Sequence, residues 1–277
     1  MYRLVICLIA LVPIAARADT PKELLEKANE ALKKNDRTEA LKLVEQAIAA
    51  DPKNAEAYSL RGDIRIAGRQ FDKAVADYSK AIELNPQFAP AYDQRGTAYF
   101  KLAKIPESLA DFNKFIELEP KAAPGHWRRG LTLYYAEKFA DGVAQFTTSD
   151  KTEPNDVENA IWHFLCNARV QGVEKARGEF LKVKEDPRGV YMMKIFELFL
   201  GKAKPEDVFA AAESGQGNKD PERIRKFYAN YYVGMYYEAT GEPKKSLELL
   251  KEAVLQYPNN HYMMDVALVH IQLRKKK

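Results

Sequence analysis

Residues 55–88 read AEAYSLRGDIRIAGRQFDKAVADYSKAIELNPQF, and residues 89–122 read APAYDQRGTAYFKLAKIPESLADFNKFIELEPKA. Each stretch has a tyrosine at its fourth position, a glycine at its eighth and a proline near its end. The same spacing extends to both sides, because prolines stand 34 residues apart at Pro52, Pro86, Pro120 and Pro154. A fixed period of this length predicts an array of stacked supersecondary units.

Each unit is expected to contain two helices. In the third unit, Tyr92, Gly96 and Tyr99 follow at steps of four and three, which gives the first helix one apolar stripe, and the second helix is spaced alike. Proline lacks an amide donor and ends the second helix. Because no single unit can bury its stripe, the pairs must stack on one another.

The pattern resembles the tetratricopeptide repeat (TPR), W-x2-L-G-x2-Y followed by A-x3-F and P. The second and third units match it at Tyr58, Gly62, Ala74, Tyr78, Ala81 and Pro86, and at Tyr92, Gly96, Tyr99, Ser108, Phe112 and Pro120. The resemblance implies an all-α fold, a right-handed superhelix (solenoid) of antiparallel helix pairs with a C-terminal capping helix. It also implies a scaffold that binds other proteins.

The chain divides into four parts. After residues 1–18, four TPR units are expected in residues 19–156, and degenerate TPR-like helix pairs in residues 157–222. A final unit and the capping helix, His261–Leu273, occupy residues 223–277. In the degenerate part, the expected helices cover Val157–Val170, Glu174–Lys184, Tyr191–Leu200 and Pro205–Ser214.

The first 18 residues predict a secretory signal peptide. Arg3 supplies a positive charge, an apolar run follows from Leu4 to Ile14, and residues 16–18 read Ala-Arg-Ala, an A-x-A cleavage site. The run is too short to anchor the chain in a bilayer. We expect cleavage after Ala18, export to the periplasm or the medium, and no stable membrane anchor.

The charge and cysteine content of the chain limit the kinds of partner and bond that we expect. Removal of residues 1–18 takes away two arginines and lowers the formal net charge from +4 to about +2, which indicates no nucleic-acid partner. The mature chain keeps one cysteine, Cys166, in an apolar stretch. We expect a buried thiol and no intramolecular disulfide.

The layout also resembles the NlpI-type TPR proteins of the bacterial envelope. The resemblance rests on the signal sequence, the N-terminal units, the block Ile161–Leu165 and the late block Phe227–Tyr237. It implies an often dimeric scaffold that brings a periplasmic protease and peptidoglycan hydrolases together. The chain departs from this family because Cys7, inside the apolar run, does not stand at a lipidation site.

Catalytic motifs are not found. The histidines His126, His163, His261 and His270 form no H-E-x-x-H pair, and the sequence contains no C-x-x-C or G-x-S-x-G. Carboxylates such as Asp72 and Asp111 are expected on solvated helix faces beside lysines. We therefore predict no enzyme, no cofactor and no metal. An active site around Trp162, His163 and Asp186 is the alternative.

The expected binding surface is the groove lined by the first helix of each pair. Its C-terminal half is rich in the aromatic and arginine side chains that dominate interface energetics. The predicted partner-binding residues are Phe100, Trp127, Arg128, Leu131, Tyr134, Tyr135, Tyr231 and Met235. Asp63 and Asp93 would repel a peptide's terminal carboxylate, so a chaperone-tail adaptor is disfavoured.

Two alternatives stay open for this surface. The aromatic residues could stack on a small ligand or a cell-wall glycan or peptide instead of a protein partner. A tyrosine stripe at helical spacing, here Tyr228, Tyr232 and Tyr236, equally fits packing between repeats. The exposed fraction of these aromatic side chains distinguishes a binding groove from packing between repeats.

Overall fold

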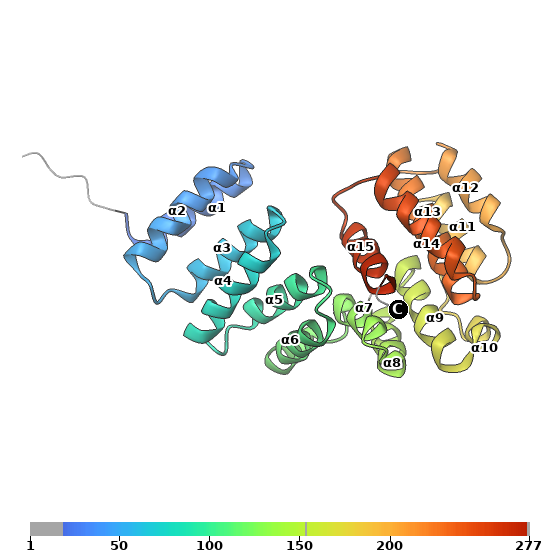
Figure 1. Ribbon diagram of the computed structural model, residues 1–277, viewed down its shortest axis with the longest axis horizontal. Helices are drawn as coiled ribbons and strands as arrows, with labels where there is room; N and C mark the ends of the chain where they lie inside the picture. Colours follow the sequence, from blue (N-terminus) through green and yellow to red (C-terminus); the bar gives the residue numbers. More distant parts are fainter. Residues whose placement is uncertain (1–18, 153, 276–277) are drawn as a thin grey trace, which may run out of the picture.

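The computed structural model describes residues 19–152 and 154–275, and in these residues the chain is a stack of helices (Figure 1). The predicted signal peptide lies outside the described residues. The N-terminal part consists of the pairs α1 (Pro21–Lys33) and α2 (Arg37–Ala50), α3 (Ala55–Ala67) and α4 (Phe71–Leu84), α5 (Ala89–Lys101) and α6 (Ile105–Leu118), and α7 (Trp127–Tyr135) and α8 (Phe139–Asp150). A 3-10 turn, η1 (Pro120–Ala122), connects α6 to α7. The prediction of an all-α solenoid is confirmed.

The 34-residue period also appears in the backbone of the turns. The residue that ends the turn within each pair lies in the left-handed region, with φ of 59° at Asn35, 58° at Arg69, 56° at Ala103 and 58° at Glu137. Gly241, at φ 87°, holds the same place in the last pair. Non-glycine residues rarely adopt this conformation, so the tight turn is a fixed requirement of the pair.

Glycines in the first helices let the two helices of a pair approach closely. A Cβ atom built at Gly62 would lie 2.6 Å from Cε1 of Tyr78, and one at Gly130 would lie 2.5 Å from Cζ of Phe146. The aromatic ring of the second helix therefore occupies the space that a side chain on the first would need. The expectation that small residues serve close packing is confirmed at these positions.

A buried ion pair also recurs with the period. Arg61 lies 2.7 Å from Asp77, and Arg95 binds Asp111 through two hydrogen bonds of 2.8 Å. Asp111 is buried, so its expected place on a solvated face is wrong. The carboxylate is held inside because the guanidinium from the facing helix satisfies both of its oxygens.

The middle of the chain departs from the repeat. It contains α9 (Val157–Gln171), α10 (Val173–Gly178), α11 (Val190–Phe199) and α12 (Pro205–Glu213). The helix expected to reach Lys184 ends at Gly178, and the following segment is held by Phe180, whose ring packs 5.2 Å from Phe164 and 5.1 Å from Phe196. A β-bridge joins Gly189 to Asn218.

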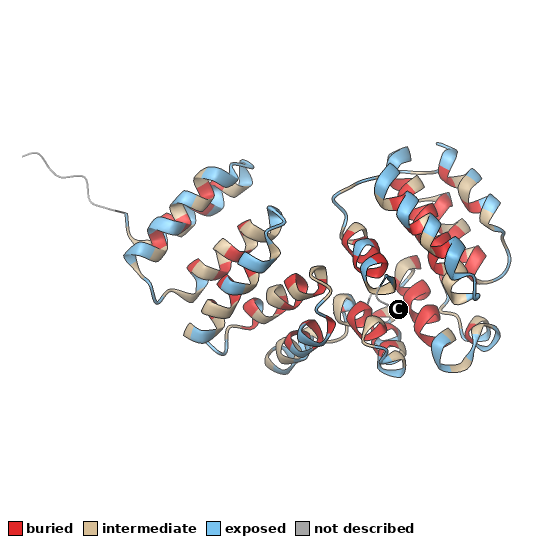
Figure 2. Ribbon diagram, in the orientation of Figure 1, coloured by how far each residue is buried: buried red, intermediate tan, exposed pale blue. Residues whose placement is uncertain are grey.

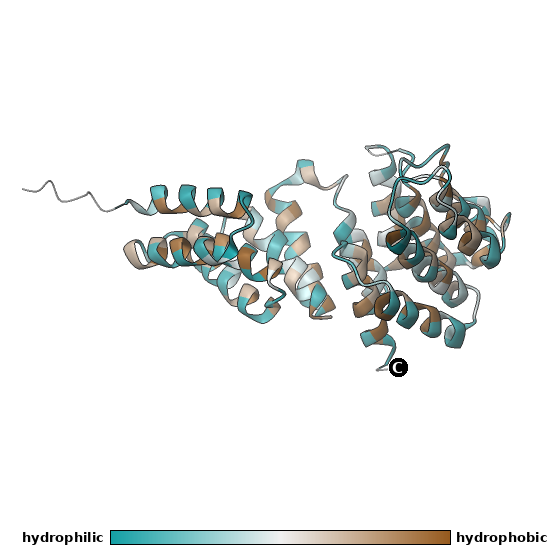
Figure 3. Cartoon of the chain, turned by 90° about the horizontal axis from the view of Figure 1, so that it is seen from above, coloured by the Kyte–Doolittle hydropathy of each residue, from teal (hydrophilic) through white to brown (hydrophobic). Residues whose placement is uncertain are grey.

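The C-terminal part contains α13 (Glu222–Ala239), α14 (Pro243–Gln256) and α15 (Tyr262–Arg274). The expected final helix is present, and it lies on the inner side of the array, between the last pair and α5 to α7 (Figure 1). Buried residues form a continuous core from α5 to α15 (Figure 2), and hydrophobic residues are denser there than in α1 to α4 (Figure 3).

Candidate functional site

The inner side of the array is closed by α15, which contacts the first helices of two pairs. The ring of Tyr262 stacks on Phe100 with 6.0 Å between centroids, and Nδ1 of His270 lies 3.2 Å from the hydroxyl of Tyr135. Asp265 lies 2.8 Å from Arg69 and 2.9 Å from Lys101. The final helix therefore occupies the surface that a groove ligand would use beside α5 and α7.

A buried charged cluster fixes the end of α15 to α13. Glu238 accepts hydrogen bonds from His270 at 2.6 Å and from Arg274. Burial raises the pKa of the Glu238 carboxyl, but the hydrogen bonds from His270 and Arg274 outweigh it and lower the pKa to about 2. The carboxylate is thus ionised at neutral pH and ties the two helices together.

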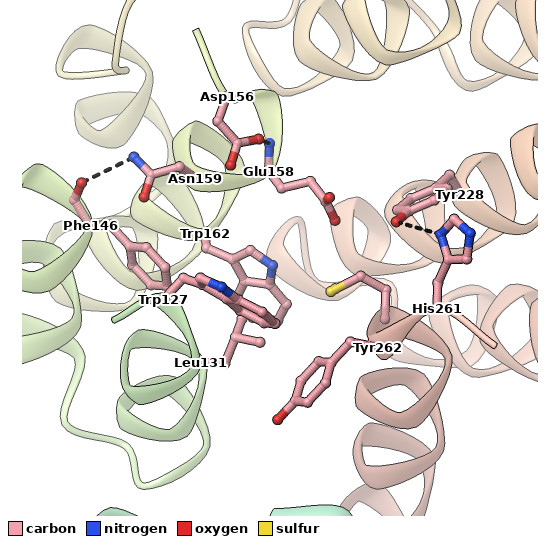
Figure 4. Close-up of a pocket in the computed structure, with 11 residues that line it drawn as sticks. Trp127, Leu131, Phe146, Asp156, Glu158, Asn159, Trp162, Tyr228, His261 and Tyr262 are labelled. Atoms are coloured by element: carbon pink, nitrogen blue, oxygen red, sulfur yellow. Dashed lines mark hydrogen bonds between the residues drawn. The ribbon is translucent and has the colours of Figure 1, made fainter. Parts of the chain in front are cut away.

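A cavity of about 330 Å³ opens where α7, α9, α13 and the start of α15 meet (Figure 4). Five tryptophan, tyrosine and phenylalanine side chains line it: Trp127, Phe146, Trp162, Tyr228 and Tyr262. Trp127 stands edge-on to Tyr262, with 4.9 Å between centroids and 87° between planes. Cavities of this size, apolar with a few polar groups, are typical of small-ligand sites.

The position of Trp127 follows from the residue before it. His126 is the N-cap of α7, and its Nδ1 accepts a hydrogen bond from the amide of Arg129 at 3.1 Å. The ring proton therefore lies on Nε2, which donates to Asp93 at 2.9 Å. Trp127 begins the helix directly after this cap and remains 41% exposed at the rim of the cavity.

Two polar atoms of residues that line the cavity have no partner among the described residues. They are Nε1 of Trp162 and Oδ1 of Asn159. Trp162 and Asn159 are only 2% and 7% exposed. A buried donor or acceptor without a partner is costly. Neighbouring side chains cover these atoms, so a molecule in the cavity gains their hydrogen bonds when those side chains shift.

Carboxylates form the charged side of the cavity. Asp156 caps α9 by accepting a hydrogen bond from the amide of Glu158 at 2.9 Å, and Glu158 accepts one of 2.5 Å from the hydroxyl of Tyr232. Arg188 pairs with Glu158 and lies 3.3 Å from Asp156 and 2.7 Å from Asp186. Burial and the neighbouring Glu158 charge raise the pKa of Asp156 to about 6, against the opposing effect of Arg188.

The repeats are recognised by comparison with known proteins. Families described as tetratricopeptide repeat match residues 25–88, 89–121 and 228–260. The chain is a TPR protein. No curated protein matches it.

Solved structures extend the likeness. A TPR protein from Parabacteroides merdae matches 91% of this chain and 98% of its own, with 17% identity and a TM-score of 0.61. Residues 41 to the end of MamA from Desulfovibrio magneticus RS-1 match 59% of this chain and 92% of their own length, with 17% identity and a TM-score of 0.54. Both likenesses concern the fold.

A shorter likeness has higher identity. The first TPR domain of Spaghetti (RPAP3), solved with an HSP90 peptide, is 31% identical over 39% of this chain and 85% of its own, with a TM-score of 0.36.

In this TPR chain, Asp93 does not face an open groove as a free charge. Arg128 and His126 hold it, and their hydrogen bonds and charges outweigh burial and lower its pKa.

Most of the groove residues predicted from the TPR frame are buried. Phe100, Leu131, Tyr134, Tyr231 and Met235 are at most 4% exposed. They belong to the core because α15 covers the inner side of α5 and α7, and because α13 lies inside the C-terminal stack.

The remaining predicted residues keep some exposure. Arg128 and Tyr135 are half-buried, and Trp127 is exposed. Two tyrosines of the predicted stripe, Tyr228 and Tyr232, are buried, so they pack between helices. Of the predicted set, Trp127 and Leu131 reach the cavity.

The residues of the alternative active site do not converge. Trp162 lines the cavity, but His163 is buried elsewhere on α9, and burial lowers its pKa. Asp186 accepts hydrogen bonds from Arg188. Across residues 19–152 and 154–275, no hydrogen bond joins His163 to Asp186. Cys166 is buried, and burial raises its pKa.

Sequence reasoning missed the carboxylate side of the cavity and the contribution of α15. Asp156 and Glu158 carried a signal, because an acidic residue before an apolar run is typical of a helix N-cap. The placement of Tyr262 depends on the chain returning to the inner side of the array, which no local pattern encodes.

The described residues contain neither a cluster of metal-binding side chains nor a helix suited to span a membrane. No three histidine, cysteine, aspartate or glutamate side chains gather there as metal ligands would. No helix in the same residues combines the length and the apolar character needed to cross a membrane.

Proposed function

We propose that this TPR protein is an exported, non-catalytic scaffold of the bacterial cell envelope that binds protein partners beside α7 and α15. The observation that carries the proposal is Trp127, a tryptophan 41% exposed at the rim of a cavity on the inner side of the array. Exposed aromatic side chains next to concave sites are typical of interaction surfaces. The stacked pairs supply a rigid frame for it.

Export is supported by the signal-peptide pattern of residues 1–18. By resemblance to the NlpI-type proteins, the proposed partners are envelope proteases and peptidoglycan hydrolases, and the proposed assembly includes a homodimer. A mature N-terminus at Asp19, measured by mass spectrometry of the protein from the periplasmic fraction, tests the export. An intact Met1 in the cytoplasmic fraction would contradict it.

In-cell cross-linking followed by affinity purification of the full chain tests the scaffold. We compare the wild type with Trp127→Ala and with Leu255→Ala, which removes another exposed apolar side chain, 72% exposed on α14. We expect Trp127→Ala to reduce capture of hydrolases and proteases at least tenfold and Leu255→Ala to leave it unchanged. Tyr134 is unsuitable as a surface variant because it is buried. Equal capture by all three proteins would contradict the proposed site.

A further inference from the structure

We propose that the cavity between Trp127 and Trp162 binds one basic residue, arginine or lysine, of a partner's polypeptide chain. The cationic group lies toward Asp156 and Glu158, and the residue's carbonyl oxygen accepts a hydrogen bond from Nε1 of Trp162. The inference rests on the proposed function, because a protein partner supplies this residue. It adds the chemistry that the cavity selects.

Charge is the first argument. Asp156, Glu158 and Asp186 share a single arginine, Arg188, so negative charge is in excess on this side of the cavity. Asp156 and Glu158 both line the cavity (Figure 4). An anionic ligand would be repelled here, and a neutral one would leave the excess uncompensated. A cation completes the site. Burial raises the pKa of Asp156, and the neighbouring Glu158 charge adds to this effect, so a cation beside the two carboxylates would favour their ionised forms.

The aromatic walls are the second argument. Cations bind favourably over the faces of tryptophan and tyrosine rings. The chain already uses this interaction at the cavity's edge, where Cζ of Arg188 lies 5.8 Å from the centroid of the Tyr228 ring. Trp127 offers a large aromatic surface at the rim, and its exposure leaves room for an incoming alkyl stem.

The unpartnered polar atoms are the third argument, independent of charge. Trp162 Nε1 can only donate and Asn159 Oδ1 can only accept, and the other amide group of Asn159 is already used, since Nδ2 donates to the carbonyl of Phe146 at 3.1 Å. A peptide group supplies one acceptor and one donor. The volume of about 330 Å³ suits one residue rather than a longer segment.

Both tryptophans of the chain line the cavity, so intrinsic fluorescence reports on it directly. We titrate the full mature chain with Nα-acetyl-L-arginine amide and with Nα-acetyl-L-citrulline amide, a neutral isostere. We expect a saturable change with the arginine probe and at least tenfold weaker binding of the citrulline probe. Equal binding of the two, or no saturable change with the arginine probe and its lysine counterpart, overturns the proposal.

Free L-arginine tests the source of the residue. With its guanidinium toward Asp156 and Glu158, its carboxylate would replace the carbonyl oxygen beside Trp162 and add a negative charge to a cavity where negative charge is already in excess. We therefore expect it to bind at least tenfold more weakly than the amide probe. Equal affinity would assign the cavity to a free amino acid and overturn the assignment to a partner's chain.

Asp156→Asn removes the charge and keeps the helix cap, because asparagine is an equally good N-cap. We expect about tenfold weaker binding of the arginine probe, against no change in Asp141→Asn, an exposed acid in the first turn of α8. Trp162→Phe keeps the aromatic wall, removes the donor and should weaken binding at least threefold. Unchanged affinity in both cavity variants overturns the proposal, and thermal melting confirms that each is folded.

The pH profile separates binding from a structural effect. With a pKa of about 6, Asp156 is about one-tenth ionised at pH 5, so wild-type affinity for the arginine probe should fall up to tenfold between pH 7.5 and 5. The charged and titratable groups around Asp156 are Glu158, Glu185, Asp186, Arg188, Lys219, Tyr228 and His261. Histidine side chains also change charge in this pH range. The pH dependence that remains in Asp156→Asn measures the contribution of groups other than Asp156, and we expect the affinity of this variant to change less than threefold. Equal slopes in both proteins overturn the role of Asp156.

The failures of the two proposals are distinguishable. If hydrolases are captured in cells but the arginine probe does not bind, the cavity assignment is overturned and the scaffold stands. If the probe binds as expected but Trp127→Ala captures the same partners as the wild type, the scaffold site is overturned and the cavity remains a site for a basic residue.

Discussion

Oε2 of Glu238 on α13 lies 2.6 Å from Nε2 of His270 on α15, and this contact decides what the inner surface of the array looks like. Arg274 completes the cluster one turn further along α15. Because α15 is held here at one end and by Asp265 toward the other, it stays on the inner side and forms one wall of the cavity.

Glu238→Gln should destabilise the fold. The pKa of Glu238 is lowered from 4.5 to about 2, which corresponds to about 3 kcal/mol of stability at neutral pH. Because the folded-state pKa is the lower one, this contribution is full above pH 4.5 and is lost as pH falls toward 2. Urea unfolding at pH 7 and at pH 3 measures it. The control is Glu252→Gln, an exposed acid on α14, and equal effects of the two would refute the cluster's role.

Asp265→Asn should loosen the other attachment. Lys101, only 13% exposed, would lose its carboxylate partner, and leaving one partner of a buried pair uncompensated costs about 1–3 kcal/mol. We expect amides of α15 to exchange about tenfold faster or more in hydrogen–deuterium exchange, with α1 and α2 unchanged. Exchange at the wild-type rate would show that Asp265 does not fix the helix.

The sequence predicted the array because each unit carries local signals at a fixed period. Prolines two residues beyond the ends of α2, α4, α6 and α14, together with glycines facing aromatic rings, are readable without coordinates. The predicted all-α architecture is therefore confirmed, including the late pair around Gly234, where the frame returns after the irregular middle.

The predicted groove could not be tested against local sequence signals in this way. The exposure of the residues on α5 and α7 depends on the position of α15, which covers them. Residues on several sides of α15 are buried, among them Met263, Asp265 and His270. A helix buried on several sides lies inside a structure rather than on its end. The available signal was the pair of polar residues, Asp265 and His270, in an apolar helix, since buried polar groups require partners. Trp127 stays exposed because it begins α7 at the array's inner edge.

The recurring turn offers a test of backbone conformation. Ala103 has φ of 56° and Gly241 φ of 87° at equivalent places. Replacing Ala103 with glycine should remove the side-chain strain and raise stability by about 0.5–1 kcal/mol, whereas Gly241→Ala should lower it by about 1 kcal/mol. Chemical denaturation of both variants checks the opposite signs. Shifts of the same sign would contradict the equivalence of the two turns.

Gly130→Ala tests the close approach within the fourth pair. The added methyl would lie 2.5 Å from the ring of Phe146, so the helices must separate, and overpacking of this kind costs about 1–3 kcal/mol. The thermal midpoint should fall by several degrees. Gly125→Ala, where a Cβ meets nothing within 4 Å, is the matched control. Replacing glycine by alanine otherwise reduces the entropy of the unfolded chain and favours folding, so a similar fall in both variants would contradict a clash at Gly130 as the cause.

Asp156→Asn should stabilise the protein while it weakens the proposed binding of a basic residue. The folded-state pKa of Asp156 is raised to about 6, so its ionised form is disfavoured in the folded chain at every pH above that value. The side chain is 38% exposed, and solvent screening reduces the effect to about 1 kcal/mol. We expect the variant to be more stable at pH 7.5 and equal to the wild type below pH 4, where the carboxyl is protonated in both states. A variant less stable at pH 7.5 would mean that Arg188 already compensates the charge, and the cavity would then have no need of a cation.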